Sequence, residues 1–129
     1  MAAPPVPHIV MVEAATLPVK IISFTASAQG KTALIEWSAT NEISSDHYIV
    51  ERSKDGITFT SISKISDKGN TGGVNHYSLV DNTPYPGLNY YRLKQVDKDG
   101  RFVYSEIKSV RFNTGKELEV YPNPVTSVV

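Results

Sequence analysis

Tyrosine and tryptophan are the residues of this sequence best suited to contacting a ligand. The chain has seven tyrosines and one tryptophan, and flat aromatic rings suit the faces of sugar rings. The strand alternation described below buries Trp37, Tyr48, Tyr77 and Tyr91, leaves Tyr85 in a loop and points Tyr90 and Tyr104 outward. We therefore predict a candidate binding surface of Tyr85, Tyr90 and Tyr104 for a polysaccharide or a protein. The alternative is that these rings form an aromatic corner of a β-sheet protein.

Two aspartates in the segment DKDG could begin a calcium loop. Asp97 and Asp99 have the spacing with which many oxygen-ligand loops start. Counted from Asp97, however, a third oxygen ligand would fall at Arg101 and a bidentate glutamate at Lys108, and both of these are cations. The segment therefore predicts an Asp-Gly hairpin turn with solvated acids, and we expect no metal site.

The sequence holds no set of residues typical of catalysis. It has no cysteine, no GxSxG and no HExxH motif, and its three histidines, His8, His47 and His76, fall in the N-terminal segment and near the starts of two predicted strands. Catalysis would require a nucleophile with a base within hydrogen-bond reach, or a pair of carboxylates facing one cleft. We expect no catalytic residues and no cofactor.

The charges are balanced and dispersed along the chain. Thirteen basic and thirteen acidic side chains give a net charge of zero, which argues against nucleic acid, an anionic membrane or a polyacidic substrate as partner. No apolar run approaches the roughly 20 residues of a membrane span, and the N-terminus lacks the pattern of a signal peptide. We expect neither nucleic-acid binding nor membrane insertion.

Short runs of β-branched and aromatic residues, separated by turn residues, predict an all-β protein with seven strands in an antiparallel β-sandwich. The predicted strands span 19–28, 31–38, 47–53, 59–65, 76–80, 89–96 and 102–112. Alternation places these residues on inward faces: Ile22, Phe24 and Ala26, then Ala33, Ile35 and Trp37, then Tyr48 and Val50, then Tyr77 and Leu79, and then Tyr91 and Leu93. A change of phase after Ile107 predicts a bulge near Lys108 and Ser109.

Turn residues support this strand order. SKDG at 53–56 and DKDG at 97–100 each place Asp-Gly between two strands, where tight hairpins need positive backbone dihedrals. PYPGLNYYRL at 84–93 is typical of a sandwich corner in which a tyrosine hydroxyl bonds to the backbone. We divide the chain into a proline-rich linker or tail (1–16), a sandwich (17–115) and a C-terminal segment (116–129).

Several strings in this order resemble a known family. Trp37, YIVERS at 48–53, HYSLVD at 76–81 and PGLNYYRL at 86–93 resemble a fibronectin type III domain, which has an immunoglobulin-like fold. LPVKIISFTA (17–26), LIEWSATNEISSDHYIVERSKDG (34–56), NYYRLKQVDKDG (89–100) and YPNP (121–124) are similar to the region just upstream of the sorting domain in proteins exported by the type IX secretion system.

The resemblance implies a non-catalytic spacer module in a secreted or cell-surface protein. It would lie between an upstream domain of the same polypeptide and a C-terminal sorting domain that engages the secretion machinery. GKELEVYPNPV at 115–125 resembles the start of that sorting domain, which would be truncated here. A carbohydrate- or protein-binding module that uses the exposed tyrosines remains the alternative function.

Overall fold

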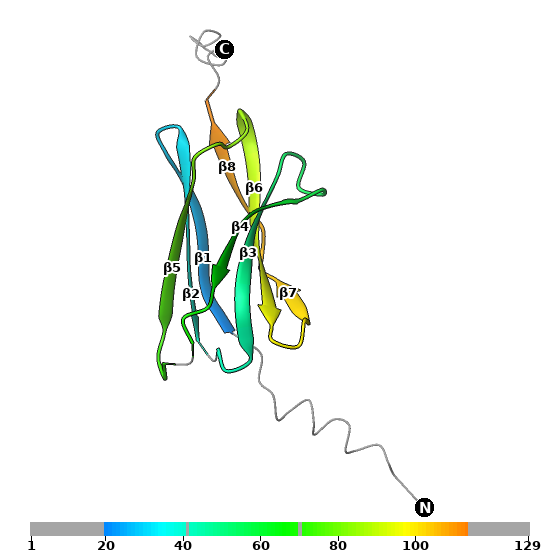
Figure 1. Cartoon of the computed structure of the whole chain (residues 1–129). Coiled ribbons are helices and arrows are strands. Elements are labelled where there is room, and N and C mark those ends of the chain that lie inside the picture. Colours follow the sequence, from blue (N-terminus) through cyan, green and yellow to red (C-terminus); the bar gives the residue numbers. More distant parts are fainter. Residues whose placement is uncertain (1–19, 41, 70, 114–129) are drawn as a thin grey trace, which may run out of the picture.

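The computed structural model describes residues 20–40, 42–69 and 71–113, and these residues form eight strands and no helix (Figure 1). The strands are β1 (Lys20–Gln29), β2 (Thr32–Thr40), β3 (Ser45–Ser53), β4 (Thr60–Ser66), β5 (Asn75–Asp81), β6 (Gly87–Asp97), β7 (Phe102–Tyr104) and β8 (Lys108–Phe112). One antiparallel sheet has the order β1-β2-β5. The other has the order β4-β3-β6, with β7 and β8 both paired to β6.

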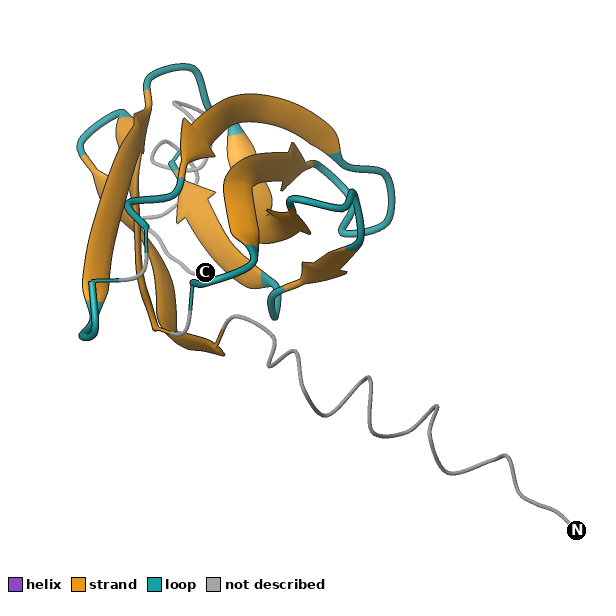
Figure 2. Cartoon of the chain, turned by 60° about the horizontal axis from the view of Figure 1, so that its bottom comes forward, coloured by secondary structure: helices purple, strands orange, loops and turns teal. Residues whose placement is uncertain are grey.

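The two sheets face each other across one hydrophobic core (Figure 2). Trp37 of β2 lies at its centre, 2% exposed, stacked on Tyr77 at 5.2 Å and edge-on to Tyr48 at 5.6 Å. The predicted inward residues Ala33, Ile35, Trp37, Tyr48, Val50, Tyr77, Tyr91 and Leu93 are all buried. The prediction of an all-β chain with two packed sheets is confirmed, and Leu79 and Ala26 pack partly buried against this core.

The predicted seventh strand is two strands, which makes the strand count eight instead of seven. β7 pairs with the end of β6 and β8 pairs with its beginning, and residues 105–107 between them are not in a strand. Ser105 fills the interruption: its N–H donates to Leu93 O at 2.9 Å, and Leu93 N–H donates to Ser105 Oγ at 2.8 Å. The bulge expected at Lys108 and Ser109 is wrong, because both residues pair in regular register with Tyr91 and Tyr90.

The inward placement of Ile22 is also wrong. The register of β1 against β2 shifts between Ile21 and Ser23, so Ile22 is the extra residue of a bulge. Such a residue is left out of the alternation. Ile22 is 49% exposed, while its neighbour Ile21 packs against the core and Phe24 is buried as predicted.

The chain enters and leaves the described sandwich at opposite ends. β1 begins at Lys20, opposite Thr40, at the lower end in Figure 1, and β8 ends at Phe112, opposite Gly87, at the upper end. The predicted linker at 1–16 and the predicted start of a sorting domain at 116–129 lie outside the described residues. The described sandwich falls within the predicted 17–115.

Candidate functional site

The loop between β3 and β4, residues 54–59, is held by its own polar side chains. Ser53 Oγ accepts hydrogen bonds from the N–H groups of Asp55 at 3.2 Å and of Gly56 at 2.9 Å. Asp55 Oδ1 accepts from the N–H groups of Ile57 and Thr58, both at 2.9 Å. These backbone hydrogen bonds lower the pKa of Asp55 to about 2. Gly56 has the predicted positive φ, 77°. The loop is longer than a tight hairpin and has a defined shape.

This loop lies against Tyr85 and Tyr90 and is linked to Tyr104 through Arg92. Lys54 Nζ lies 4.8 Å from the ring centroid of Tyr85. Gly56 lies over Tyr90: a Cβ at this position would be 3.6 Å from the ring, an ordinary van der Waals distance. At the other end of the loop, Phe59 stacks on Arg92, which in turn lies under Tyr104. The three tyrosines are therefore connected through one loop.

Arg92 is the centre of a stack of aromatic rings and cations on the outer face of the five-stranded sheet. Its guanidinium lies 4.0 Å from the ring centroid of Phe59 and 3.7 Å from that of Tyr104. Its Nε donates to Glu51 Oε1 at 2.7 Å across the β3–β6 pair. The planar guanidinium suits this geometry, since it can stack on rings and hydrogen-bond in its own plane.

Lys94 continues the stack toward β7. Its Nζ lies 4.1 Å from the ring centroid of Phe102, and Phe102 meets Tyr104 edge-on at 5.4 Å. Phe102 is 48% exposed and Tyr104 44%, so both rings offer surface to a ligand. We call Phe59, Arg92, Tyr104, Phe102 and Lys94 the cation–aromatic ladder.

Tyr85 belongs to a different cluster at the end of the sandwich where β8 finishes. The guanidinium of Arg52 lies 4.4 Å from its ring centroid, and Asn89 Oδ1 and Nδ2 bond to its backbone N–H and C=O. Tyr85 also lines a groove of about 570 Å³, together with Pro84, Pro86 and Phe112 among other residues. Tyr90 and Tyr104 thus share a sheet face, whereas Tyr85 lies at the end.

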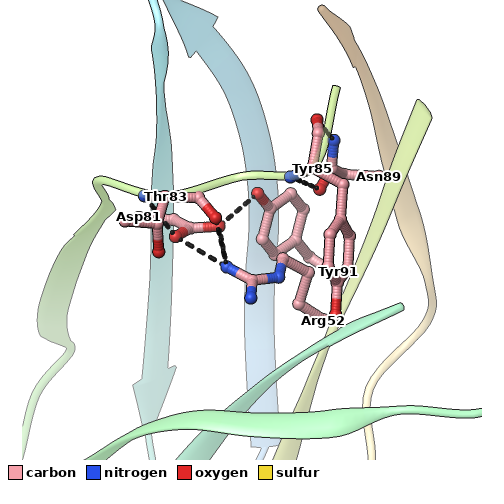
Figure 3. A network of polar contacts seen from close by, with 6 residues as sticks. All are labelled: Arg52, Asp81, Thr83, Tyr85, Asn89 and Tyr91. Atoms are coloured by element: carbon pink, nitrogen blue, oxygen red, sulfur yellow. Dashed lines mark hydrogen bonds and ion pairs between the residues drawn. The ribbon is translucent and has the colours of Figure 1, made fainter. Parts of the chain in front are cut away.

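Asp81 connects this cluster to the core (Figure 3). Its carboxylate accepts hydrogen bonds from Arg52 Nη1 at 2.9 Å and from the hydroxyl of Tyr91 at 2.7 Å, and from Thr83 N–H at 3.1 Å. Burial would raise the pKa of Asp81, but the bonds from Tyr91, Arg52 and Thr83 outweigh it and hold the pKa below its usual value. The hydroxyl of the corner tyrosine, Tyr91, therefore donates its hydrogen bond to a carboxylate. The sequence had predicted a hydrogen bond to the backbone.

The predicted Asp-Gly turn at 97–100 is confirmed. Gly100 has φ 93°, and its N–H donates to Asp97 O at 2.9 Å. Asp99 accepts bonds from the backbone N–H and Nε of Arg101, each at 3.0 Å, and Asp97 accepts one from Gln95. Within residues 20–40, 42–69 and 71–113, no group of three or more His, Cys, Asp or Glu side chains is placed to hold a metal ion.

The histidines do not assemble a site in the described part of the chain. His47 Nδ1 lies 2.6 Å from Asp46 Oδ2, and His76 is exposed on β5, where its backbone carbonyl accepts a bond from Lys68. His8 lies outside the described residues. The described chain also contains no helix long and apolar enough to cross a membrane.

Sequence reasoning missed Phe59 and Phe102 as parts of the candidate site. Phe59 was assigned to the start of a strand, and Phe102 was assigned to the last strand without a role. A signal for the ladder is present in the sequence, because every second residue of β6 and β7 points to the same face of the sheet. The β6–β7 register places Tyr90, Arg92 and Lys94 of β6 on one face with Phe102 and Tyr104 of β7.

No family model matches the sequence, and no curated protein matches it. Among solved structures, the chain is similar to part of a β-1,2-glucanase from Parabacteroides distasonis, with 19% sequence identity and a TM-score of 0.53, over 74% of this chain and 14% of that chain. It also matches part of Astrotactin-2, a vertebrate-specific, perforin-like membrane protein involved in neuronal development, with 18% identity and a TM-score of 0.43, over 74% and 21% of the two chains. This chain thus spans a small part of either protein, and the likeness to the glucanase concerns the fold alone.

Proposed function

We propose that this chain is a non-catalytic connecting module of a larger secreted or cell-surface protein. The observation that carries the proposal is the position of the two ends: β1 starts at one end of the sandwich and β8 stops at the other. A rigid unit with this geometry holds the polypeptide on its two sides apart by its own length. Ten residues of β1 correspond to about 30 Å at the rise of a β-strand.

The packing of the core supports stiffness of the sandwich between its two ends. Aromatic residues from both sheets meet at the centre of the core, and Arg52 of β3 and Tyr91 of β6 both bond to Asp81 of β5. These contacts join the two sheets at the middle and near the end where β8 finishes. A module that bends little sets the distance between its neighbours more firmly than a flexible linker of the same number of residues.

We further propose that the sandwich is of the fibronectin type III, immunoglobulin-like type and precedes a type IX secretion sorting domain. The strings that resemble this family and the two-sheet architecture support the proposal.

The chain has no cysteine, which allows a direct test of the connecting role. Lys20→Cys and Asn113→Cys place labels at the two ends, and both residues are exposed. Single-molecule fluorescence transfer should give one narrow distance distribution, unchanged by salt. A control with Lys20→Cys and Gly73→Cys, which lies near the same end as Lys20 through Thr40, should give a much shorter distance. A broad distribution for the first pair would overturn the proposal.

The cation–aromatic ladder favours a second candidate function, the binding of a polysaccharide. Exposed rings of Phe102 and Tyr104 beside Lys94 and Arg92 combine a sugar-stacking surface with hydrogen-bond donors for sugar hydroxyls. Affinity electrophoresis in gels containing polygalacturonate or dextran tests this. Tyr104→Ala should abolish retardation and Val80→Ala, on the other sheet, should not. No retardation of the unaltered chain in either gel would exclude this function and leave the connecting role.

A further inference from the structure

The two sheets leave an open groove on the side where their edge strands β1 and β7 lie. The groove has a volume of about 350 Å³ and is lined mainly by Ile21, Ile22 and Phe24 from one sheet and by Val103 and Ser105 from the other. Val103 pairs with Gln95, whose side chain is buried on the inner face of the sheet. Val103 therefore also points inward, yet it is 50% exposed. The core is not covered on this side by the described residues.

The backbone at this groove is also without a sheet partner on one side. Among the described strands, β1 pairs with β2 alone and β7 with β6 alone. Each therefore presents a free edge of N–H and C=O groups beside an apolar wall in which Ile22 is 49% exposed. Edge strands of this kind accept a further strand readily.

A short apolar segment of the same chain, residues 9–12, is a suitable occupant of the groove, because it is connected through residues 13–19 to β1. Residues 9–12, Ile-Val-Met-Val, are a run of four apolar residues between Pro7 and Pro18, and they lie outside the described residues. Residues 13–19 connect this run to Lys20, which immediately precedes Ile21 of the groove. Seven residues can span up to about 25 Å, enough to turn back along β1. A tethered segment also has a high effective concentration, on the order of millimolar.

We propose that residues 9–12 bind in the groove between β1 and β7 as an added strand that covers Ile22 and Val103. The segment then closes the open side of the core, and its backbone satisfies a free sheet edge. Alternation in the added strand turns one pair of side chains, either Ile9 and Met11 or Val10 and Val12, into the groove. The segment before β1 is thereby part of the folded unit, in addition to any linking role.

Disulfide trapping tests the proposal, because the chain has no other cysteine. Met11→Cys and, in a second variant, Val12→Cys are each combined with Val103→Cys in a full-length chain and with Val80→Cys in a matched control, since Val80 is exposed on β5 of the other sheet. At least one of the two pairs with Val103→Cys should oxidise within the monomer at least tenfold faster than its control. Rates equal to the controls for both pairs would overturn the proposal, and disulfide-linked dimers as the main product would assign the groove to a second copy of the chain.

Hydrogen exchange gives a second readout that needs no new bond. Two full-length variants, Ile9→Asp with Met11→Asp and Val10→Asp with Val12→Asp, each place charge on one side of the segment. One of them should exchange at least tenfold faster than the unaltered chain at residues 21–24 and 102–104. The 98–101 turn serves as the internal control and should not change. Unaltered exchange at the groove in both variants would overturn the proposal.

Discussion

The hydroxyl of Tyr91 donates a 2.7 Å hydrogen bond to Oδ2 of Asp81. Tyr91 belongs to β6 of the five-stranded sheet and Asp81 ends β5 of the three-stranded sheet, so this bond crosses the interior of the sandwich. Arg52 of β3 bonds to the same carboxylate with a guanidinium that is only 12% exposed. A single aspartate thus joins two strands of one sheet to the other sheet.

Asp81→Asn should therefore destabilise the protein by about 2 to 4 kcal/mol. The substitution keeps the size of the side chain but removes the charge that compensates buried Arg52, and an unpaired buried charge is costly. Asp99→Asn is the control, because its partner Arg101 is 81% exposed and such pairs contribute about 0.2 to 1 kcal/mol. Urea denaturation measures both. Equal midpoints for the two variants would contradict a role for Asp81 in joining the sheets.

The lowered pKa of Asp81 also predicts how stability changes in acid. A carboxyl group whose folded pKa is below its unfolded value of about 3.9 stabilises the fold above that pH, and the contribution is lost as pH falls through the folded pKa. Asp55 acts in the same direction down to about pH 2. The free energy of unfolding should fall between pH 4 and 2, and it should fall less steeply in Asp81→Asn. Parallel curves from urea denaturation would show that Asp81 does not contribute.

Three buried tyrosines predict the opposite dependence in alkali. Burial, together with hydrogen bonds to Glu42 or Asp81, raises the pKa of Tyr48, Tyr77 and Tyr91 well above the usual 10. Stability from each is complete below pH 10 and is lost as pH rises, by up to about 1.4 kcal/mol per pH unit. Urea midpoints between pH 9 and 11.5 should fall less steeply in Tyr91→Phe than in the unaltered chain. Tyr104→Phe, which removes an exposed hydroxyl, should leave the slope unchanged.

Alternation predicted the core because each inward residue sits on a regular part of a strand. Ile35, Trp37, Val50 and Leu93 are buried as expected. Ile22 was assigned wrongly because the bulge of β1 lies at two consecutive isoleucines, Ile21 and Ile22. Both are apolar, so the sequence pattern does not show which of the two points inward. The division of β7 from β8 depends on the hydrogen bonds of Ser105 to Leu93, which follow from pairing between distant segments and not from local sequence.

Buried polar residues were beyond the reach of the same reasoning. Glu42 is 2% exposed and accepts bonds from the hydroxyls of Tyr48 and Tyr77 and from Asn75 Nδ2. Its burial depends on donors from β3 and β5, 6 to 35 residues away in sequence. At the candidate site, the outward direction of Tyr90 and Tyr104 could be predicted from strand parity. Their connection to Tyr85 through the 54–59 loop could not, because SKDG alone indicates only a turn.

Arg92→Lys is the sharpest test of the cation–aromatic ladder. The guanidinium of Arg92 stacks between Phe59 and Tyr104 and bonds to Glu51 at the same time. An ammonium group is a compact, strongly hydrated charge that cannot do all three. We expect a loss of about 1 to 2 kcal/mol, since each cation–π contact contributes about 0.5 to 1 kcal/mol at partly exposed sites.

The loss should be concentrated at β7, because that strand has only three residues and pairs only with β6 among the described strands. Hydrogen exchange at residues 102–104 should accelerate in Arg92→Lys while residues 35–37 of β2 keep their protection. Lys94→Arg is the matched control: it retains a cation over Phe102, so its stability should change by less than about 0.5 kcal/mol. If both variants behave alike, the ring stack around Arg92 does not hold β7, and the exposed rings of Phe102 and Tyr104 are positioned by the strand pairing alone.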